Sequence, residues 1–484
     1  MIWIIVLLPF ISGLVSFVVP WSPIRRAMLV SVSFAHTIGV FSLWSKGYDL
    51  PVESWIAVDG LSLFFLLITS SLFFLGSFST VAYLKGHRFP DSERPFSRES
   101  VFVASMLIFL ATTTLVIVSH HTGVFWMAIE ATTLATAPLI AYQRSPGALE
   151  AAWKYLLICS VGIAMALVGN TALAVSSLFP GGGHSIPMTF QGLAEQGIGL
   201  NPLWLKIAFA FILVGYGTKM GLAPMHTWLP DAHSEAPSPV SALLSGALCN
   251  CALLGIIRTG SILNGAGMGY YWRTLMIAFG VLSVIMSGCM VLKQSGFKRL
   301  LAYSTVEHMG ILAIAVGVGA GTGGLFHALN HSLTKGSLFF VAGSVLSLYH
   351  TKAIASVSGL IRLAPVTGAI WIGGFMSICG LPPFGTFFSE MMILSSLGSQ
   401  GRWLVMGILL LGLSMVFIGM WKAVISMVFG DVSPGLDVPS GRKIVWEDLP
   451  PMILCGTALA LGIWTPAPLC RLIESAASAI LGGI

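Results

Sequence analysis

Charged side chains are scarce in this sequence. Only 9% of its 484 residues are Asp, Glu, Lys or Arg, whereas a soluble globular protein carries about 25%. Hydrophobic residues make up 56%, and the mean hydropathy is +0.90. This composition excludes an ordinary soluble domain and predicts a protein that lies mostly inside a membrane. The net charge of +6 falls mainly in short loops, which indicates membrane topology rather than nucleic-acid binding.

Motifs for cofactors and for covalent catalysis are also lacking. None of the seven cysteines forms a CxxC pair, which argues against an iron–sulfur cluster or a structural zinc site. No GxGxxG or GxxxxGKS/T sequence opens a helix after a strand, so nucleotide binding is not indicated. No nucleophile elbow supports Ser–His–Asp catalysis. We therefore expect this chain to hold no cofactor, no metal ion and no catalytic residue of its own.

Long apolar runs fill the chain instead. Runs of about 20 residues, enough to cross about 30 Å of hydrocarbon as a helix, recur from end to end. We count about fourteen, which predicts an all-α, multi-pass membrane protein. Loops are short except at 85–99, 180–202 and 430–449. One set of alternate loops carries fifteen Lys and Arg, and the other set carries five. The richer side should be cytoplasmic, with both termini outside a bacterial or archaeal cell membrane.

Two halves of the sequence share a layout. Residues 100–259 hold five predicted spans, one of them broken beside Lys219, and residues 272–429 hold five more, one broken beside Glu390. Because five is odd, the second unit would be inverted relative to the first, an arrangement typical of transport proteins. A three-helix segment at 1–99 precedes the two repeats. A loop and a last helix at 430–484 follow them.

The most unusual stretch is Gly215–Pro239, GYGTKMGLAPMHTWLPDAHSEAPSP, which places Lys219 at membrane depth before a proline break. A charged side chain at the centre of a bilayer costs at least about 2.5–3.5 kcal/mol, so such residues are usually functional. Other ionisable groups lie within spans, and His327, His331 and Lys335 share one helical face at i, i+4, i+8 spacing. We interpret the set as a proton relay: Glu130, Lys219, His327, His331, Lys335 and Glu390.

Plainer interpretations exist for each group. A Glu–Lys pair could be a static link between helices, and the two relay histidines could hydrogen-bond neighbouring helices together. His226, Asp231 and His233 have donor atoms suited to zinc. Their position across a proline-rich break favours a role in loop packing instead.

Three segments carry a family resemblance: TKMGLAPMHTWLPDAHSEAPSPVSALLSG, KRLLAYSTVEHMG and HALNHSLTKGSLFF. They resemble the antiporter-like, proton-translocating subunits of respiratory complex I and of Mrp-type antiporters. The segment SPGALEAAWKYLLICSVGIAMALVGN most resembles the membrane subunits of hydrogenase-4 and formate hydrogenlyase. The resemblance extends over about residues 55–430.

The resemblance implies roles for particular residues. Glu130 would pair with Lys219, and Lys335 would be the central lysine with His327 and His331 beside it. Glu390 would be the last group of the path. Ser245 stands where related subunits often have Lys or His, so bound water would have to bridge this gap. Residues that could hold such water, or join the relay, are Ser245, Asn250, His226 and His308.

The resemblance also implies a place in an assembly. Partners would be other antiporter-like and small membrane subunits and a peripheral redox arm on the cytoplasmic side, with NiFe and Fe–S centres on those partners. The resulting hypothesis is a proton-translocating subunit of a membrane-bound hydrogenase or complex I-like oxidoreductase. A subunit of a stand-alone ion/proton antiporter and a non-pumping membrane anchor of a hydrogenase are the alternatives.

Overall fold

The computed structural model describes residues 1–46, 54–86, 94–178, 187–431 and 446–481. Parts of the three long predicted loops therefore lie outside the described residues. Within those ranges the regular structure is helical, and only isolated bridges such as that between Ile56 and Ser119 pair extended backbone. The α-helices are α1 (Ile2–Val18), α2 (Ser22–Lys46), α3 (Gly60–Gly86), α4 (Arg98–Val118), α5 (Thr122–Ile140), α6 (Pro146–Ser176), α7 (Phe190–Glu195), α8 (Pro202–Met220), α9 (Trp228–Glu235), α10 (Ser238–Leu243), α11 (Cys249–Gly265), α12 (Gly269–Val291), α13 (Phe297–Gly317), α14 (Gly321–Tyr349), α15 (Leu360–Leu363), α16 (Pro365–Ile378), α17 (Gly385–Ser399), α18 (Trp403–Phe429), α19 (Leu449–Ile463) and α20 (Ala467–Leu481).

Ten helical segments among the described residues are long and apolar enough to cross a membrane. Helices α19 and α20 meet at 84° across a short break and would make an eleventh span if they count as one. Helices α1 and α16 are apolar but shorter. The all-helical membrane architecture is thus confirmed, whereas the count of fourteen spans stays a prediction.

Polar residues set the starts of several long helices. The Ser97 side chain accepts a hydrogen bond from the Ser100 amide at the start of α4, and Asn201 caps α8 in the same way. Capping oxygens of this kind satisfy amides that have no partner within the helix. Pro146 and Pro202 follow their caps, at the first helical position where proline loses no hydrogen bond.

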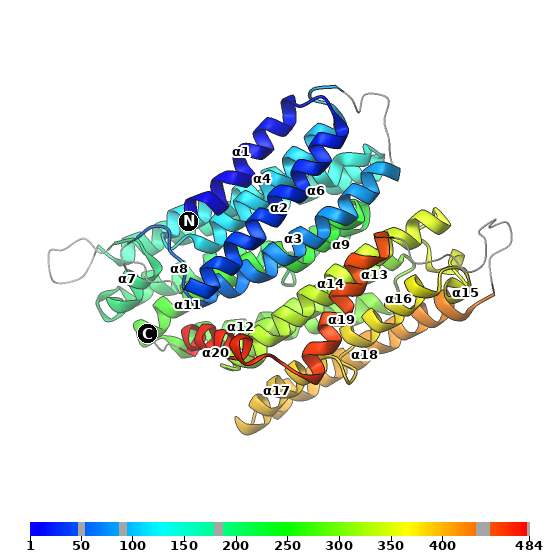
Figure 1. The fold of residues 1–484 in the computed structure, drawn as a ribbon. Helices are drawn as coiled ribbons and strands as arrows, with labels where there is room; N and C mark the ends of the chain where they lie inside the picture. The colour runs from blue at the N-terminus through cyan, green and yellow to red at the C-terminus, as the bar shows by residue number, and fades with distance from the viewer. Residues whose placement is uncertain (47–53, 87–93, 179–186, 432–445, 482–484) are drawn as a thin grey trace.

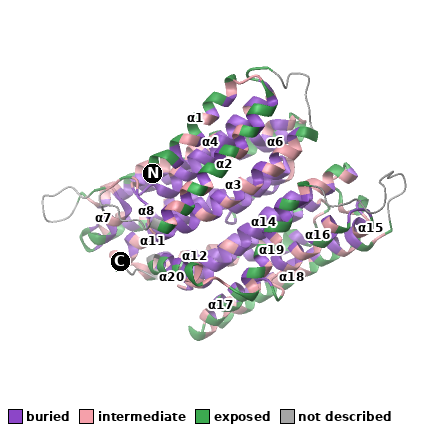
Figure 2. Ribbon diagram, viewed as in Figure 1, coloured by how far each residue is buried: buried purple, intermediate pink, exposed green. Residues whose placement is uncertain are grey.

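The helices form a bundle (Figure 1), and many of its large apolar side chains are buried while others are exposed. Helix α13 and the segment from α10 to α11 are buried along their whole apolar windows, whereas only 22% of the apolar window of α18 is buried. Figure 2 shows the exposed positions concentrated on outer helices such as α1, α2, α17 and α18. These exposed positions include large apolar side chains such as Leu411 and Ile418, as expected of a surface that faces lipid.

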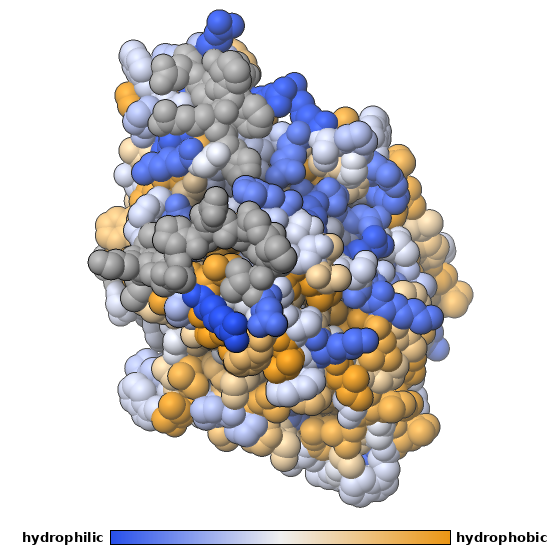
Figure 3. All heavy atoms as spheres, turned by 90° about the vertical axis from the view of Figure 1, so that its right-hand side faces the viewer, coloured by the Kyte–Doolittle hydropathy of each residue, from blue (hydrophilic) through white to orange (hydrophobic). Residues whose placement is uncertain are grey.

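Loops gather at two opposite ends of the bundle. At one end, backbone bridges join Ile56 to Ser119 and His121 to Thr189. At the other end, a bridge joins Gly296 to Ala353. Figure 3 views the end near α15, where hydrophilic side chains gather beside apolar flanks.

Two helices break in the same manner. Helix α8 ends at Met220, and Gly221 follows with φ +88°, a left-handed conformation that favours glycine. Helix α16 ends at Ile378, and Gly380 follows with φ +60°. A cis X–Pro bond lies shortly after each of these glycines. Each break leaves an ionisable side chain, Lys219 or Glu390, close to the end of a helix inside the protein.

Candidate functional site

Lys219 lies in the last turn of α8 and is completely buried. Its ammonium Nζ donates to the Thr133 hydroxyl of α5 at 2.5 Å and to the Tyr155 hydroxyl of α6 at 2.9 Å. Nζ also lies 4.8 Å from the centre of the Tyr155 ring, within the range of a cation–π interaction. Neutral hydroxyls and an aromatic ring therefore make up its immediate surroundings.

Close packing of α8 against α6 brings Lys219 to Tyr155. A Cβ on Gly215 would lie 2.6 Å from the Gly162 carbonyl oxygen and from the Ala166 side chain. Small residues at such crossings let helix backbones approach closely in a membrane. The glycine is thus needed for the position of the lysine.

Glu130 reaches Lys219 only through a bridging hydroxyl. Its carboxylate accepts hydrogen bonds from Thr133 at 3.2 Å and from Ser160 at 3.0 Å. Both Glu130 and Lys219 belong to the described part of the chain, and no ion pair within 4.0 Å joins them. The Thr133 hydroxyl accepts from the lysine and donates to the glutamate. In this structure, a hydrogen-bonded series of three side chains, Glu130–Thr133–Lys219, therefore takes the place of the direct pair that the resemblance implied.

The segment that follows the break after α8 is held by ion pairs at one end of the bundle. Asp231 of α9 contacts Lys154 at 3.0 Å and Arg299 at 3.1 Å. The His233 Nδ1 atom pairs with the Leu229 carbonyl oxygen within the same helix. These contacts agree with a packing role for the segment. His226 is buried in the short helix Met225–Thr227, with its ring 6.3 Å from that of Tyr303, and joins no other predicted relay residue.

Ser245 lies in a π-helical turn, Leu244–Leu248, between α10 and α11. Its hydroxyl pairs with that of Thr305 on α13 at 2.9 Å. The Asn250 amide nitrogen donates to the Gly246 carbonyl oxygen and to the Ser332 hydroxyl. Among the described residues, neither Ser245 nor Asn250 hydrogen-bonds a lysine, so the two side chains are free of the relay lysines and are candidates for holding water between Lys219 and Lys335.

Lys335 lies fully buried on α14. Its ammonium donates to the Leu301 carbonyl oxygen at 2.7 Å and to the Ser304 hydroxyl. Since Ser304 is next to Thr305, neighbouring hydroxyls of α13 contact Lys335 on one side and Ser245 on the other. Sequence reasoning missed this connection, because serine and threonine are common in apolar helices.

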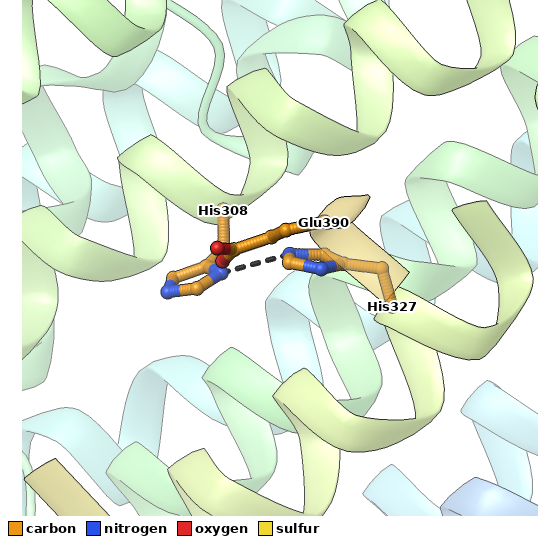
Figure 4. Close-up of side chains that lie close together, drawn as sticks. All are labelled: His308, His327 and Glu390. Atoms are coloured by element: carbon orange, nitrogen blue, oxygen red, sulfur yellow. Dashed lines mark hydrogen bonds between the residues drawn. The ribbon is translucent and has the colours of Figure 1, made fainter. Parts of the chain in front are cut away.

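A cluster of His308, His327 and Glu390 joins α13, α14 and α17 (Figure 4). The His308 Nδ1 and His327 Nε2 atoms are 2.8 Å apart. Each of the three residues offers one atom that could bind a metal ion, and these atoms lie within 4.8 Å of one another. This spacing suits a metal ion as well as a shared proton. All four ring nitrogens already have hydrogen-bond partners, which favours the proton.

The partners of this histidine pair limit where its protons lie. The Ile378 carbonyl oxygen can only accept, so His308 Nε2 carries a proton. When the Ser389 hydroxyl donates to the Thr386 carbonyl oxygen at 2.7 Å, it can only accept from His327 Nδ1. Both outer nitrogens are then protonated, and the short contact between the rings needs one additional proton. When the hydroxyl turns to His327 instead, the pair is neutral.

Two further groups lie near this cluster. The His331 ring centre is 5.2 Å from that of His308, and among the described residues neither of its buried ring nitrogens has a partner. Glu307, one residue before His308, is also buried, and its Oε1 atom has no partner within the same described ranges. Glu307 is absent from the predicted relay, although an acidic residue in an apolar run is itself a signal of function.

The fold and this set of buried groups define a class: an integral, multi-pass helical membrane protein with ionisable side chains packed between its helices. Residues 119–418 match the family described as the transmembrane part of NADH:quinone oxidoreductase and Mrp antiporter subunits. The chain belongs to this family, as the sequence motifs predicted. A curated relative is the hydrogenase-4 component F homolog of Methylacidiphilum infernorum, 37% identical over 401 residues that cover 81% of this chain and 82% of the relative.

Solved structures of low identity share the fold. A chain of the membrane-bound sulfane sulfur reductase, an archaeal respiratory membrane complex, aligns with a TM-score of 0.87 at 21% identity, over 99% of this chain and 97% of that chain. A chain of the Mrp complex from Dietzia sp. DQ12-45-1b aligns with a TM-score of 0.86 at 18% identity, over 99% and 96%. Both neighbours are parts of multisubunit membrane complexes.

Proposed function

We propose that this chain is a proton-translocating subunit of a redox-driven membrane complex of the hydrogenase or NADH:quinone oxidoreductase type. The observation that carries the proposal is the burial of ionisable groups in the helical bundle. Lys219, Glu307 and His308 are buried in helices long and apolar enough to cross a membrane. His327, Lys335 and Glu390 are buried on helices α14 and α17, which pack against each other, and α14 also packs against α13. Groups that exchange protons are costly inside a membrane and usually mark ion pathways. The similarity to a hydrogenase-4 component F homolog supports the redox-driven assembly.

The first step of the path is the chain Glu130–Thr133–Lys219. Removing or adding charge at Glu130 changes the orientation that the Thr133 hydroxyl prefers, and with it the hydrogen bonding of the Lys219 ammonium. A buried ammonium that loses a hydrogen bond is driven towards its neutral form, because desolvation penalises the charge. A conformational change in partner subunits that moves α5 or α8 would therefore release a proton from Lys219.

The second step passes through hydroxyls to Lys335. Water held near Ser245 would carry the proton to Thr305 and Ser304, and the Ser304 hydroxyl contacts the Lys335 ammonium. No charged side chain stands at position 245, so this section of the path conducts without storing charge.

The third step is storage on the His308–His327 pair. Rotation of the Ser389 hydroxyl separates a neutral pair from one that holds an extra proton. The Glu390 carboxylate lies close enough to balance the positive charge of the protonated pair. Glu390 then leads the proton out of the subunit.

The proposal includes the finer architecture. Fourteen spans would comprise two inverted repeats, 100–259 and 272–429, flanked by 1–99 and 430–484. The matching breaks after α8 and α16 support the repeats. The basic loops would face the cytoplasm, where a peripheral redox arm with NiFe and Fe–S centres would dock, and both termini would lie outside.

Two substitutions test the proposal. Lys219→Ala should abolish proton translocation and slow redox turnover of the assembled complex in membrane vesicles, and Lys335→Ala should abolish translocation. Lys206→Ala, an exposed lysine on the same helix as Lys219, is the matched control and should leave both rates unchanged. If Lys219→Ala retains wild-type rates of both processes, the relay is wrong. Unimpaired translocation in Lys335→Ala would refute only the path beyond Lys219.

A further inference from the structure

Glu307 is a buried acid that the proposed path does not use. It lies on α13, a helix that is buried along its whole apolar window, and the residue itself is 1% exposed. Its Oε1 atom has no hydrogen-bond partner among the described residues. An acidic group without a partner is costly in such a place, so its presence points to a function.

The described hydrogen bonds leave a gap in the path between Lys335 and the histidine pair. The Lys335 ammonium donates to a carbonyl oxygen and to the Ser304 hydroxyl, both on α13. His308 and His327 bond each other, a backbone carbonyl oxygen and a serine hydroxyl. Within the described part of the chain, no hydrogen bond runs from the lysine to the pair. A proton on Lys335 therefore needs a further group to reach the histidines.

Helix geometry places Glu307 at this gap. It lies three residues after Ser304 and immediately before His308, and residues three and four apart are neighbours on a helix surface. The serine that contacts Lys335, the glutamate and a histidine of the pair thus follow one another within about one turn of α13. Helix α14, which carries Lys335, packs against α13, and the charges of Glu307 and Lys335 interact.

Ionisable groups from several helices meet where α16 ends. Cys379, directly after α16, interacts electrostatically with Glu307, Lys335 and Glu390. The two carboxylates come from α13 and α17, and each has an Oε1 atom without a partner among the described residues. Glu390 in turn lies beside the histidine pair (Figure 4). The break after α16 therefore brings one buried ammonium and two buried acids close to the histidines.

We infer that Glu307 accepts a proton from Lys335 and passes it to the His308–His327 pair, an inference that rests on the proposed function. In the first transfer the ammonium becomes a neutral amine and the carboxylate becomes a carboxylic acid. Lysine and glutamate together have no net charge before or after this transfer, so no uncompensated charge forms inside the bundle. Direct transfer from the lysine to the histidines would instead leave the Glu307 carboxylate without its counter-charge.

The first test is proton translocation by the assembled complex in membrane vesicles during redox turnover. Glu307→Gln keeps the size of the side chain but cannot take up a proton, so translocation should fall about a hundredfold or more, as for the loss of a positioned acid–base group. Glu307→Asp restores an acid on a shorter side chain and should recover part of the rate. Glu195→Gln, which changes an exposed glutamate on α7, is the matched control and should translocate like the wild type.

The second test identifies the group that takes up the proton. Infrared difference spectra between the resting complex and the complex in turnover should contain a carbonyl band of a protonated carboxylic acid that shifts in heavy water. This band should be lost in Glu307→Gln and should move in Glu307→Asp. A purely structural role of Glu307 would produce neither change.

Two results would overturn the inference. The first is wild-type translocation in assembled Glu307→Gln while Lys335→Ala is inactive, a result that would leave the proposed function intact. The second is an unchanged carbonyl band in assembled Glu307→Asp, which refutes the inference even if the glutamine variant fails to assemble. If Lys219→Ala and Lys335→Ala both translocate normally, the proposed function itself is wrong and the role of Glu307 falls with it.

Discussion

Replacement of Thr133 by valine tests the first step of the proposed path most directly. Valine has nearly the shape of threonine, so Thr133→Val removes the bridging hydroxyl while it preserves the packing of α5. The variant leaves the Lys219 ammonium with the Tyr155 hydroxyl alone and takes one of two hydrogen bonds from Glu130. Helix assembly should therefore be retained while proton transfer slows.

The size of the effect follows from the bond that is lost. A hydrogen bond to a charged group contributes about 1.5–3 kcal/mol, and each 1.4 kcal/mol in a barrier changes a rate about tenfold. If the bond acts in the transfer step, translocation should fall roughly ten- to hundredfold. Thr133→Ser, which restores a hydroxyl, should recover most of the rate.

The assay is proton uptake into vesicles that contain the assembled complex, measured with a pH-sensitive dye during redox turnover. Thr113→Val is the control, because this buried hydroxyl bonds only carbonyl oxygens of its own helix. Adding Thr133→Val to Glu130→Gln should lower the rate little further, since both changes interrupt one chain. Wild-type translocation in Thr133→Val, with Lys219→Ala inactive, would show that the hydroxyl is not part of the path.

Three other predictions concern different parts of the protein. Ser389→Ala should remove the partner of His327 Nδ1 and slow translocation without changing assembly, measured in the same vesicle assay; full activity would contradict the storage step. Burial and the charge of Arg258 lower the pKa of His120 to about 3, so the free energy of unfolding should be highest above about pH 6.5 and should fall on acidification, by about 2 kcal/mol at pH 5. The melting temperature of His120→Gln should therefore fall less between pH 7 and pH 5 than that of the wild type. Gly215→Leu should force α8 away from Ala166 and cost about 1–3 kcal/mol or more, seen as a lower melting temperature in detergent.

The hydropathy pattern and the glycine–proline breaks of the sequence predict most of the helices that the structure contains. The break beside Lys219 and the break before Glu390 both occur where the sequence indicated them. Boundaries were less certain where polar residues belong to a helix. The hydropathy pattern predicts that one span begins at residue 154, whereas α6 begins at Pro146. The first two turns of α6 include Glu150 and end at Lys154, and these charged residues lower the hydropathy there.

The contacts between distant segments could not be predicted from the sequence. Asp59 and Arg258 are separated by 199 positions, and nothing local in the sequence links them. The contacts of Thr133 with Lys219 and Glu130 could not be predicted for a different reason. Hydroxyls in apolar helices commonly bond carbonyl oxygens of their own helix, as Thr113 does, so only the three-dimensional structure distinguishes a bridging hydroxyl from an ordinary one.

The serine at position 245 decides where a positive charge can rest along the proposed path. A lysine or histidine at this position would hold a proton as a stable charge midway between Lys219 and Lys335. A hydroxyl paired with Thr305 cannot do so, because neither group carries a positive charge at ordinary pH. On the proposed path, positive charge would then rest only at the two lysines and at the histidine pair. A proton on Lys219 and one on Lys335 would repel each other without an intermediate charge between them, so release from one would favour uptake at the other.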